Sequence, residues 1–364
     1  MVRKYPQLEV DLSILRSNAR QVITHCQQQG IRVCGVVKGV DGLPEVARAM
    51  RLCGAEELGT SRLEQVERCR AAGVGGPWLL IRIPGLSELP DVVRLCETSL
   101  QSERVTLDAL EEECVLQGKT HRVIVMADLG DLREGFWDKD EMVDVCVHVE
   151  RELPHVELAG VGVNLTCYGS TKPTPEKMQA LLDIAARIEK RIGRKLEIIS
   201  GGATSSYTLV HWDTMPQGIN HLRIGENILL SYDLQNLWHI SDMDYLRTDT
   251  FTLTAEVIEV REKPTYPQGE FAIDAFGRKP VYVDRGIRRR AILALGRADV
   301  GELESLIPRE VGLTVIGGSS DHRIVDVEDC PRRLEVGDIV EFSLCYSHLL
   351  YATSRSDITI QFVN

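Results

Sequence analysis

Residues 32–38 read Arg-Val-Cys-Gly-Val-Val-Lys, a short apolar run that ends in a lysine. We interpret Arg32–Val37 as a buried strand, because a short run rich in β-branched residues is typical of a strand covered on both faces. The next segment, Leu43–Cys53, has the spacing of an amphipathic helix. A buried strand followed by a helix is the repeating unit of parallel α/β folds.

The same alternation continues to about residue 240. Further strands are predicted at Glu57–Thr60, Trp78–Ile83, Thr98–Gln101, Arg122–Asp128, Val156–Asn164, Leu196–Ser200 and His221–Ile224. Helices are predicted at Ser61–Ala72, Glu88–Cys96, Glu103–Gln117, Lys139–Glu152 and Thr174–Ile192, and Ser13 is the expected N-cap of a first helix to about Gln29. Eight strands separated by helices over roughly 230 residues predict a (β/α)₈ barrel, since a doubly wound open sheet usually has fewer strands.

From about residue 250 the pattern changes to strand-like runs divided by turn signals, and helical periodicity nearly disappears. These runs are Thr250–Val260, Val281–Val283, Ala291–Leu295, Thr314–Ile316, Ile324–Val327, Ile339–Leu344 and Ile358–Val363. We therefore expect an α/β protein with a barrel domain at 1–245 and a mostly antiparallel β domain at 246–364. Pairing of residues 1–12 with the β domain is left open.

Composition narrows the function classes. The 364 residues suffice for two domains, and acidic residues outnumber basic ones by 54 to 42, a formal charge of −12 that disfavours nucleic acid. The ten cysteines form no Cys-x-x-Cys pair, so we expect no metal site and reduced thiols. We find no apolar stretch long enough to span a membrane and no signal peptide, and therefore expect a cytoplasmic protein without membrane partners.

Lys38 stands where a barrel would place an active-site residue, at the carboxyl end of its first strand. Burial would lower the pKa of its ammonium group, as a lysine that forms a Schiff base requires. A lysine that extends to solvent from the strand end is an equally plain interpretation. The loop Ser200-Gly-Gly-Ala-Thr-Ser-Ser206 offers glycines and hydroxyls to a phosphate, although a plain turn after a strand would read the same way.

Together, several motifs resemble the alanine-racemase-type pyridoxal-phosphate enzymes, a barrel followed by a β domain, and within them the ornithine racemase-like branch. The matching stretches are Val36-Val-Lys38-Gly, Asp128-Leu-Gly-Asp-Leu-Arg-Glu-Gly135, Gly160-Val-Gly-Val-Asn-Leu-Thr-Cys-Tyr-Gly169, Ser200-Gly-Gly, Gly218-Ile-Asn-His-Leu-Arg-Ile-Gly-Glu226 and Ser319-Ser-Asp-His322. They occur in the family's order across the whole chain.

The resemblance implies a role for each matching position. Lys38 would hold pyridoxal 5'-phosphate and act as acid and base on one face of the substrate Cα. Arg223 would face the pyridine nitrogen and keep it unprotonated, because a guanidinium group accepts no proton; pairing with Glu226 is the structural alternative. The resemblance also implies cofactor-binding residues, namely Asn164, Gly202, Thr204, Ser205, Gly225 and Glu226. Arg133 would bind the substrate carboxylate.

The sequence departs from the family where the second proton-transfer group is expected. The usual Gly-Tyr-x-Asp-Gly segment reads Gly296-Arg-Ala-Asp-Val300, so its tyrosine is missing. Racemisation needs a proton donor on the face opposite Lys38, and the candidates on the β domain are Ser320, His322 and Tyr346. Asp321 resembles the aspartate that, in related basic-amino-acid decarboxylases, binds the substrate's distal amine. His322 is also a candidate for binding the substrate.

These residues predict a racemase that interconverts the L and D forms of an amino acid, with ornithine or lysine as the expected substrate. The family architecture implies a head-to-tail homodimer with shared active sites. Two alternatives remain open from the sequence. One is a basic amino-acid decarboxylase on the same scaffold, which Arg223 disfavours. The other is a pyridoxal-phosphate homeostasis protein, which the second domain disfavours.

Overall fold

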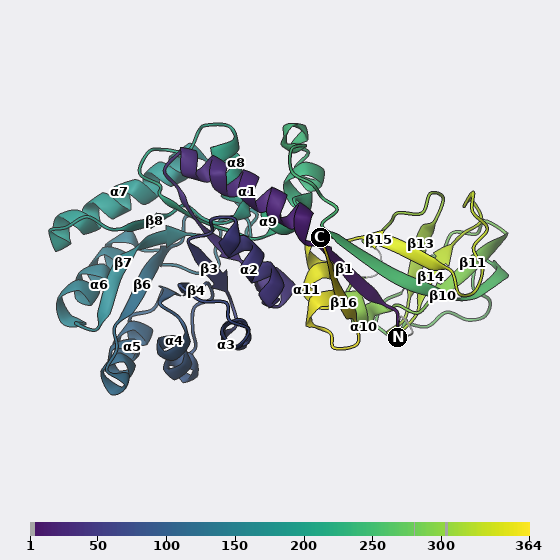
Figure 1. Cartoon of the computed structure of the whole chain (residues 1–364), viewed down its shortest axis with the longest axis horizontal. Coiled ribbons are helices and arrows are strands. Elements are labelled where there is room, and N and C mark those ends of the chain that lie inside the picture. The colour runs from purple at the N-terminus through teal and green to yellow at the C-terminus, as the bar shows by residue number, and fades with distance from the viewer. Residues whose placement is uncertain (1–3, 280, 303–304) are drawn as a thin grey trace. The chain divides into compact units, whose positions relative to one another are not determined.

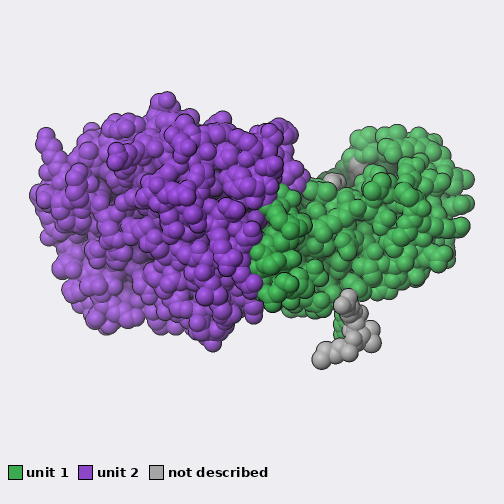
Figure 2. Space-filling model, turned by 45° about the horizontal axis from the view of Figure 1, so that its top comes forward, with its two compact units in different colours: residues 1–14, 247–364 green, residues 15–246 purple. Residues whose placement is uncertain are grey.

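The chain forms two compact units, coloured separately in Figure 2. A computed structural model describes residues 4–279, 281–302 and 305–364. The unit that we call the barrel unit comprises residues 15–246, and the β unit comprises residues 1–14 and 247–364. The division in the chain thus lies between Leu246 and Arg247, and the N-terminal segment belongs to the β unit.

The barrel unit contains eight parallel strands that close in the order β2 to β9, with helices around them (Figure 1). The strands are β2 Arg32–Val36, β3 Glu57–Thr60, β4 Trp78–Leu80, β5 Thr98–Gln101, β6 His121–Ala127, β7 Val156–Val163, β8 Ile198–Ser200 and β9 His221–Ile224. This confirms the predicted barrel followed by an antiparallel β domain. Cys34, Leu100 and Ile124 belong to a cluster of buried side chains contributed by several strands.

Helices separate the strands of the barrel. They are α1 Leu12–Gln28, α2 Pro44–Leu52, α3 Leu63–Ala71, α4 Leu89–Leu95, α5 Arg104–Gln117, α6 Lys139–Glu152, α7 Pro175–Ile192, α8 Tyr207–His211 and α9 Glu226–Leu229. Ser13 is not the N-cap of α1, contrary to the sequence prediction. Asp11 caps it, since its Oδ1 accepts hydrogen bonds from the amide nitrogens of Ser13 (2.8 Å) and Ile14 (3.0 Å). Both residue types favour this position, so sequence alone could not choose between them.

The β unit is built on one mainly antiparallel sheet with the strand order β12-β15-β10-β11-β14-β13. Its strands are β1 Gln7–Asp11, β10 Phe251–Pro264, β11 Ile287–Leu293, β12 Ile307–Pro308, β13 Thr314–Gly318, β14 Arg323–Asp326, β15 Ile339–Ser343 and β16 Thr359–Val363. Strand β1 pairs antiparallel with β10 and parallel with β16. The N-terminal strand thereby joins segments about 240 and 350 residues further along the chain.

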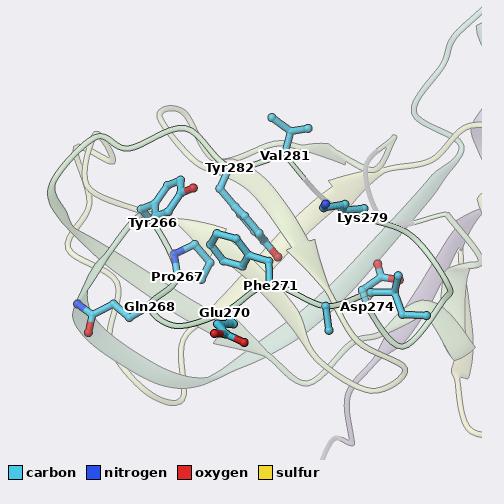
Figure 3. Close-up of a pocket in the computed structure, with 11 residues that line it drawn as sticks. Tyr266, Pro267, Gln268, Glu270, Phe271, Asp274, Lys279, Val281 and Tyr282 are labelled. Carbon is cyan, nitrogen blue, oxygen red and sulfur yellow. The ribbon is translucent and has the colours of Figure 1, made fainter.

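Two predictions for the β unit are wrong. The near absence of helical periodicity after residue 250 predicted almost no helix, but α11 spans Tyr346–Ser354 and a short helix α10 spans Arg297–Val300. Val281–Val283, expected as a strand, has no regular structure. It lies in the long connection between β10 and β11, where Tyr266, Phe271 and Tyr282 pack with ring centroids 5.5–6.4 Å apart. These aromatic side chains line a pocket of about 460 Å³ (Figure 3), so contacts between side chains replace strand pairing there.

Among the helices of the described residues, none is both long and apolar enough to cross a bilayer.

Gly160 lies where two strands of the barrel leave no room for a side chain. Strand β7 bulges at Ala159, since Leu158 pairs with Val123 and Gly160 with Ile124, and Gly160 also pairs with Ile198 of β8. A Cβ atom at position 160 would lie 1.8 Å from the carbonyl oxygen of Ile198. Only glycine fits at this position.

We therefore predict that Gly160→Ala lowers the free energy of unfolding by about 3 kcal/mol or more, because two strands of a closed barrel would have to separate. Urea denaturation followed by circular dichroism measures the change. Gly75→Ala is the control, since a Cβ atom there would meet nothing within 4 Å. Equal midpoints for the two variants would contradict the prediction.

Candidate active site

Lys38 follows β2 and begins a 3₁₀ turn that spans Lys38–Val40. Its side chain is half-buried. Burial is the largest influence on its ammonium group and lowers the pKa, and the positive charges of Arg133 and Arg223 act in the same direction. Cys167 and Glu134 oppose this lowering. The structure thus brings Lys38 into the electrostatic range of side chains from three other strand ends, and its amine loses its proton more readily than that of an ordinary lysine.

Arg223 lies in β9 and is almost wholly buried, with 4% of its surface exposed. Its Nη1 donates a hydrogen bond to Oγ of Ser200, and its Nη2 donates to the carbonyl oxygen of Val163 at 2.8 Å. Within the described residues, Arg223 therefore bonds to β7 and β8 rather than to Glu226, the alternative partner considered from the sequence. Burial lowers its pKa, and the Glu134 carboxylate acts against that effect.

Asn164 directly follows β7, and the loop after it is organised by a carboxylate that sequence reasoning did not single out. Asp131 is 1% exposed, and its Oδ1 accepts hydrogen bonds from the amide nitrogens of Thr166 (2.8 Å) and Gly169 (3.1 Å). Its Oδ2 lies 3.5 Å from Nδ2 of Asn164. Sγ of Cys167 lies 3.5 Å from Oδ1 of Asn164. Asp131 thereby holds the β7 loop beside the β6 loop. Its place in the Asp128–Gly135 motif was the available signal.

Arg133 is exposed and forms a two-point ion pair with its neighbour Glu134. That hydrogen-bonded contact raises the pKa of the Arg133 guanidinium. The guanidinium is therefore a permanent cation at this end of the barrel, and it already contacts a carboxylate of its own chain. A carboxylate substrate would compete with Glu134 for it.

The predicted phosphate-binding residues occupy two neighbouring turns. Gly202 has a φ of 119°, and Thr204 and Ser205 lie in the short 3₁₀ helix Thr204–Ser206 that follows β8. Gly225 and Glu226 begin α9 after β9, and Oγ1 of Thr204 accepts a hydrogen bond from the amide nitrogen of Asn227 at 3.4 Å. The two turns are thus joined directly.

Space and polarity in these turns suit an anion. A Cβ atom at Gly202 would lie 2.5 Å from Oγ of Ser206. That hydroxyl is buried and has no hydrogen-bond partner in the described part of the chain. A buried hydroxyl without a protein partner calls for a ligand or water. The N–H groups at the first turn of each helix offer further donors.

The remaining predicted residues lie in the β unit. Ser320, Asp321 and His322 form the exposed turn between β13 and β14, and Oγ of Ser320 donates to Oδ2 of Asp321 at 2.5 Å. This turn contacts the segment where the family tyrosine is missing, because the amide nitrogens of Arg297 and Ala298 donate to the carbonyl oxygens of Ser319 (3.0 Å) and Ser320 (2.9 Å). Two segments selected from sequence alone therefore lie side by side.

Tyr346 is the first residue of α11. Cys345 precedes it as the N-cap, and hydrogen bonds from His348 and Ser347 lower the pKa of the Cys345 thiol to about 7 although burial acts against them. Tyr346 is consequently held at a helix start rather than on a strand.

The chain is similar to known proteins over most of its length. The family model described as "Alanine racemase, N-terminal domain" matches residues 10–232. The chain is 40% identical to lysine racemase of Thermotoga maritima over 348 residues, 96% of each chain. It is 37% identical to ornithine racemase of Acetoanaerobium sticklandii over 346 residues, 95% of this chain and 96% of the relative. The solved structure of alanine racemase from Streptomyces lavendulae superposes with a TM-score of 0.77 at 20% identity, covering 100% of this chain and 98% of the other.

We predict that the Lys38 amine reacts with acylating reagents at lower pH than an ordinary lysine, because a lowered pKa leaves a larger neutral fraction at each pH. Competitive labelling with acetic anhydride across pH 6–11, read by peptide mass spectrometry, measures this. Lys195, whose side chain is 88% exposed, is the control within the same protein. Coincident labelling curves for the two lysines would contradict the prediction.

Proposed function

Because the chain belongs to the alanine racemase family and is an amino-acid racemase, we propose that it uses pyridoxal 5'-phosphate to interconvert the L and D forms of basic amino acids such as lysine and ornithine. The observation that carries the proposal is the pairing of Lys38, an amine with a lowered pKa, with Arg223, a buried guanidinium at the same end of the barrel. The names of the two relatives at 37% and 40% identity support the substrate class.

The residues present fit this cofactor. Lys38 supplies the amine that would hold its aldehyde carbon. Gly202, Thr204, Ser205, Gly225 and Glu226 frame the two turns that would hold its phosphate, and the buried Ser206 hydroxyl, which lacks a partner among the described residues, is a ready donor there. Asn164 and Arg133 border the same strand ends. When bound, pyridoxal phosphate draws electrons from the substrate Cα, which makes the Cα proton easier to remove.

The proposed proton transfers belong to residues of this chain. Lys38 would take the Cα proton from one face of one enantiomer and, in the reverse direction, would donate a proton to that face. The opposite face requires a second group, for which Tyr346 and Ser320 of the β unit remain the candidates. Arg223 donates hydrogen bonds and accepts no proton, which favours rapid reprotonation of Cα and disfavours decarboxylation. Arg133 would receive the substrate carboxylate.

The proposal includes a head-to-tail homodimer and a cytoplasmic location. The family architecture supports the first, because it supplies the second proton-transfer group from a partner subunit's β domain. Asp321 and His322 would then contact the substrate side chain. Both lie in an exposed turn, where a carboxylate is free to meet an ammonium group.

We expect the purified protein, supplied with pyridoxal phosphate, to exchange the Cα proton of L-lysine and L-ornithine for deuterium in D₂O and to racemise both. Proton NMR and polarimetry measure the two events, and Lys38→Ala should abolish both because the first proton acceptor is gone. Release of CO₂ would contradict the racemase assignment and indicate a decarboxylase. Absorption by bound cofactor without turnover of any amino acid would also contradict it and indicate a protein that only carries the cofactor.

We expect Asp321→Ala to lower kcat/KM for lysine and ornithine by about 10- to 100-fold, the range for loss of a charge-assisted hydrogen bond. Alanine has no distal amine, so its kcat/KM should change less than about twofold. Steady-state kinetics with the three substrates test this. Asp329→Ala, which removes another exposed β-unit carboxylate (69% exposed), is the matched control. An equal loss for alanine would sink the assignment.

A further inference from the structure

Three polar side chains besides Arg223 lie along adjacent strands of the barrel. Glu57 starts β3, Ser200 ends β8, and His221 and Arg223 lie two residues apart in β9, so both face the same side of that strand. Strand pairing brings these residues to neighbouring positions around the closed barrel. Cys34 of β2 pairs with Glu57 of β3 on one side and with Arg223 of β9 on the other, and Ser200 of β8 pairs with His221 of β9. The family comparisons and the proposed function give Glu57 and His221 no role.

These side chains form one continuous series of contacts. Arg223 donates from Nη1 to Oγ of Ser200. Oγ of Ser200 lies 2.8 Å from Nδ1 of His221, and Nε2 of His221 lies 3.3 Å from Oε2 of Glu57. Within the described residues neither Nε2 of His221 nor Oε2 of Glu57 forms a hydrogen bond, so their 3.3 Å contact is a close approach between a ring nitrogen and a carboxylate oxygen. At the end opposite Arg223, the series reaches the Glu57 carboxylate.

One direction of the donors places a proton opposite the Glu57 carboxylate. A guanidinium group accepts no hydrogen bond, so Ser200 accepts from Arg223 and has its own proton available for Nδ1 of His221. Nδ1 can receive that proton only if it is unprotonated, which places the ring proton on Nε2, facing Glu57. Every proton in the series then points from the arginine toward the carboxylate.

The side chains of this series are largely buried, so their hydrogen bonds and charges cannot be satisfied by solvent. Arg223 is 4% exposed, and the side chains of His221 and Glu57 are 4% and 13% exposed. A buried guanidinium needs complete hydrogen bonding and a nearby negative charge. Glu57 lies within the same barrel interior, at the far end of the series.

We propose that Glu57 and His221 are positioning residues that act through Ser200 to fix the orientation and the charge of Arg223. The proposal rests on the proposed function, since Arg223 matters to racemisation only where it faces the cofactor's pyridine nitrogen. Glu57 fixes the ring tautomer of His221, His221 fixes the hydroxyl of Ser200, and Ser200 holds one edge of the guanidinium while the carbonyl of Val163 holds the other.

The same residues invite a second interpretation. Sγ of Cys34, a carboxylate oxygen of Glu57 and a ring nitrogen of His221 lie within 4.8 Å of one another, and these are residue types that bind zinc. Two features disfavour a cation there. Burial, and after it the Glu57 carboxylate, raise the pKa of the Cys34 thiol, which stays protonated. The buried positive charge of Arg223 is also close enough to act on that thiol.

The first test uses the protein without cofactor and so does not depend on turnover. Nitrogen-15 NMR of ring-labelled histidine should show His221 as the neutral ring protonated at Nε2, and Glu57→Gln should convert part of it to the Nδ1-protonated form. A doubly protonated or Nδ1-protonated ring in the parent protein would overturn the proposal, as would zinc bound at one equivalent per chain.

The second test uses the loaded enzyme. Glu57→Gln should shift the absorption maximum of bound pyridoxal phosphate and lower kcat by about tenfold, the lower end of the effect for residues that orient a functional group without touching the substrate, with KM within about twofold. Glu111→Gln is the matched control, because it alters another histidine–glutamate pair of the barrel unit, 2.6 Å long, on the outer helix α5. A spectrum and kcat like those of Glu111→Gln would refute the proposal.

Ser200→Ala keeps the test decisive if Glu57→Gln does not fold. It removes the link itself and should give the same spectral shift and the same loss in kcat. If the parent protein shows no racemisation, the proposed function fails, while the NMR result still decides whether Glu57 controls the His221 ring.

Discussion

The buried charge of Arg223 is the constraint on which the barrel's active end depends. A guanidinium with 4% exposure is stable only if each edge meets an acceptor, and the acceptors come from β7 and β8. The same positive charge acts on the amine of Lys38 at the end of β2 and adds to the effect of burial. Arg223 therefore links the pKa of Lys38 to the hydrogen bonds at the ends of β7 and β8, so a change in those hydrogen bonds also changes the pKa of the lysine.

Closure of the barrel explains why residues far apart in the sequence act together. Parallel strands end at one rim, so the loops after β2, β6, β7, β8 and β9 meet there although they span residues 38–226. Asp131 shows how the rim is stiffened, since one buried carboxylate in the β6 loop accepts amide hydrogen bonds from the β7 loop. Gly160 shows the cost of this closeness, because the strands below the rim leave no room for a Cβ atom.

Much of this could be predicted from sequence, and the reasons for the failures are physical. The barrel strands followed from the alternation of short strand-like segments with amphipathic helices, and Thr98–Gln101 and His221–Ile224 match the observed strands. Helix α11 was missed because its nine residues show only a weak separation of apolar and polar faces. Asp11 was missed as a cap because Ser13 suits the position equally well. Glu57 lay outside every motif and His221 lay in the Gly218–Glu226 motif without a role, because barrel closure alone brings the two side chains together.

A polar series inside a barrel is costly for folding, and that cost argues for a role beyond stability. Burying three polar side chains beside a guanidinium gains less free energy than an apolar core of equal volume would. Removing one link leaves a buried donor unpaired, which costs about 1–3 kcal/mol. Arg223 therefore imposes its own requirements on Ser200, then on His221, and finally on Glu57. The residues that set the behaviour of this active end thus extend from its rim into the barrel, beyond any group that a substrate could touch.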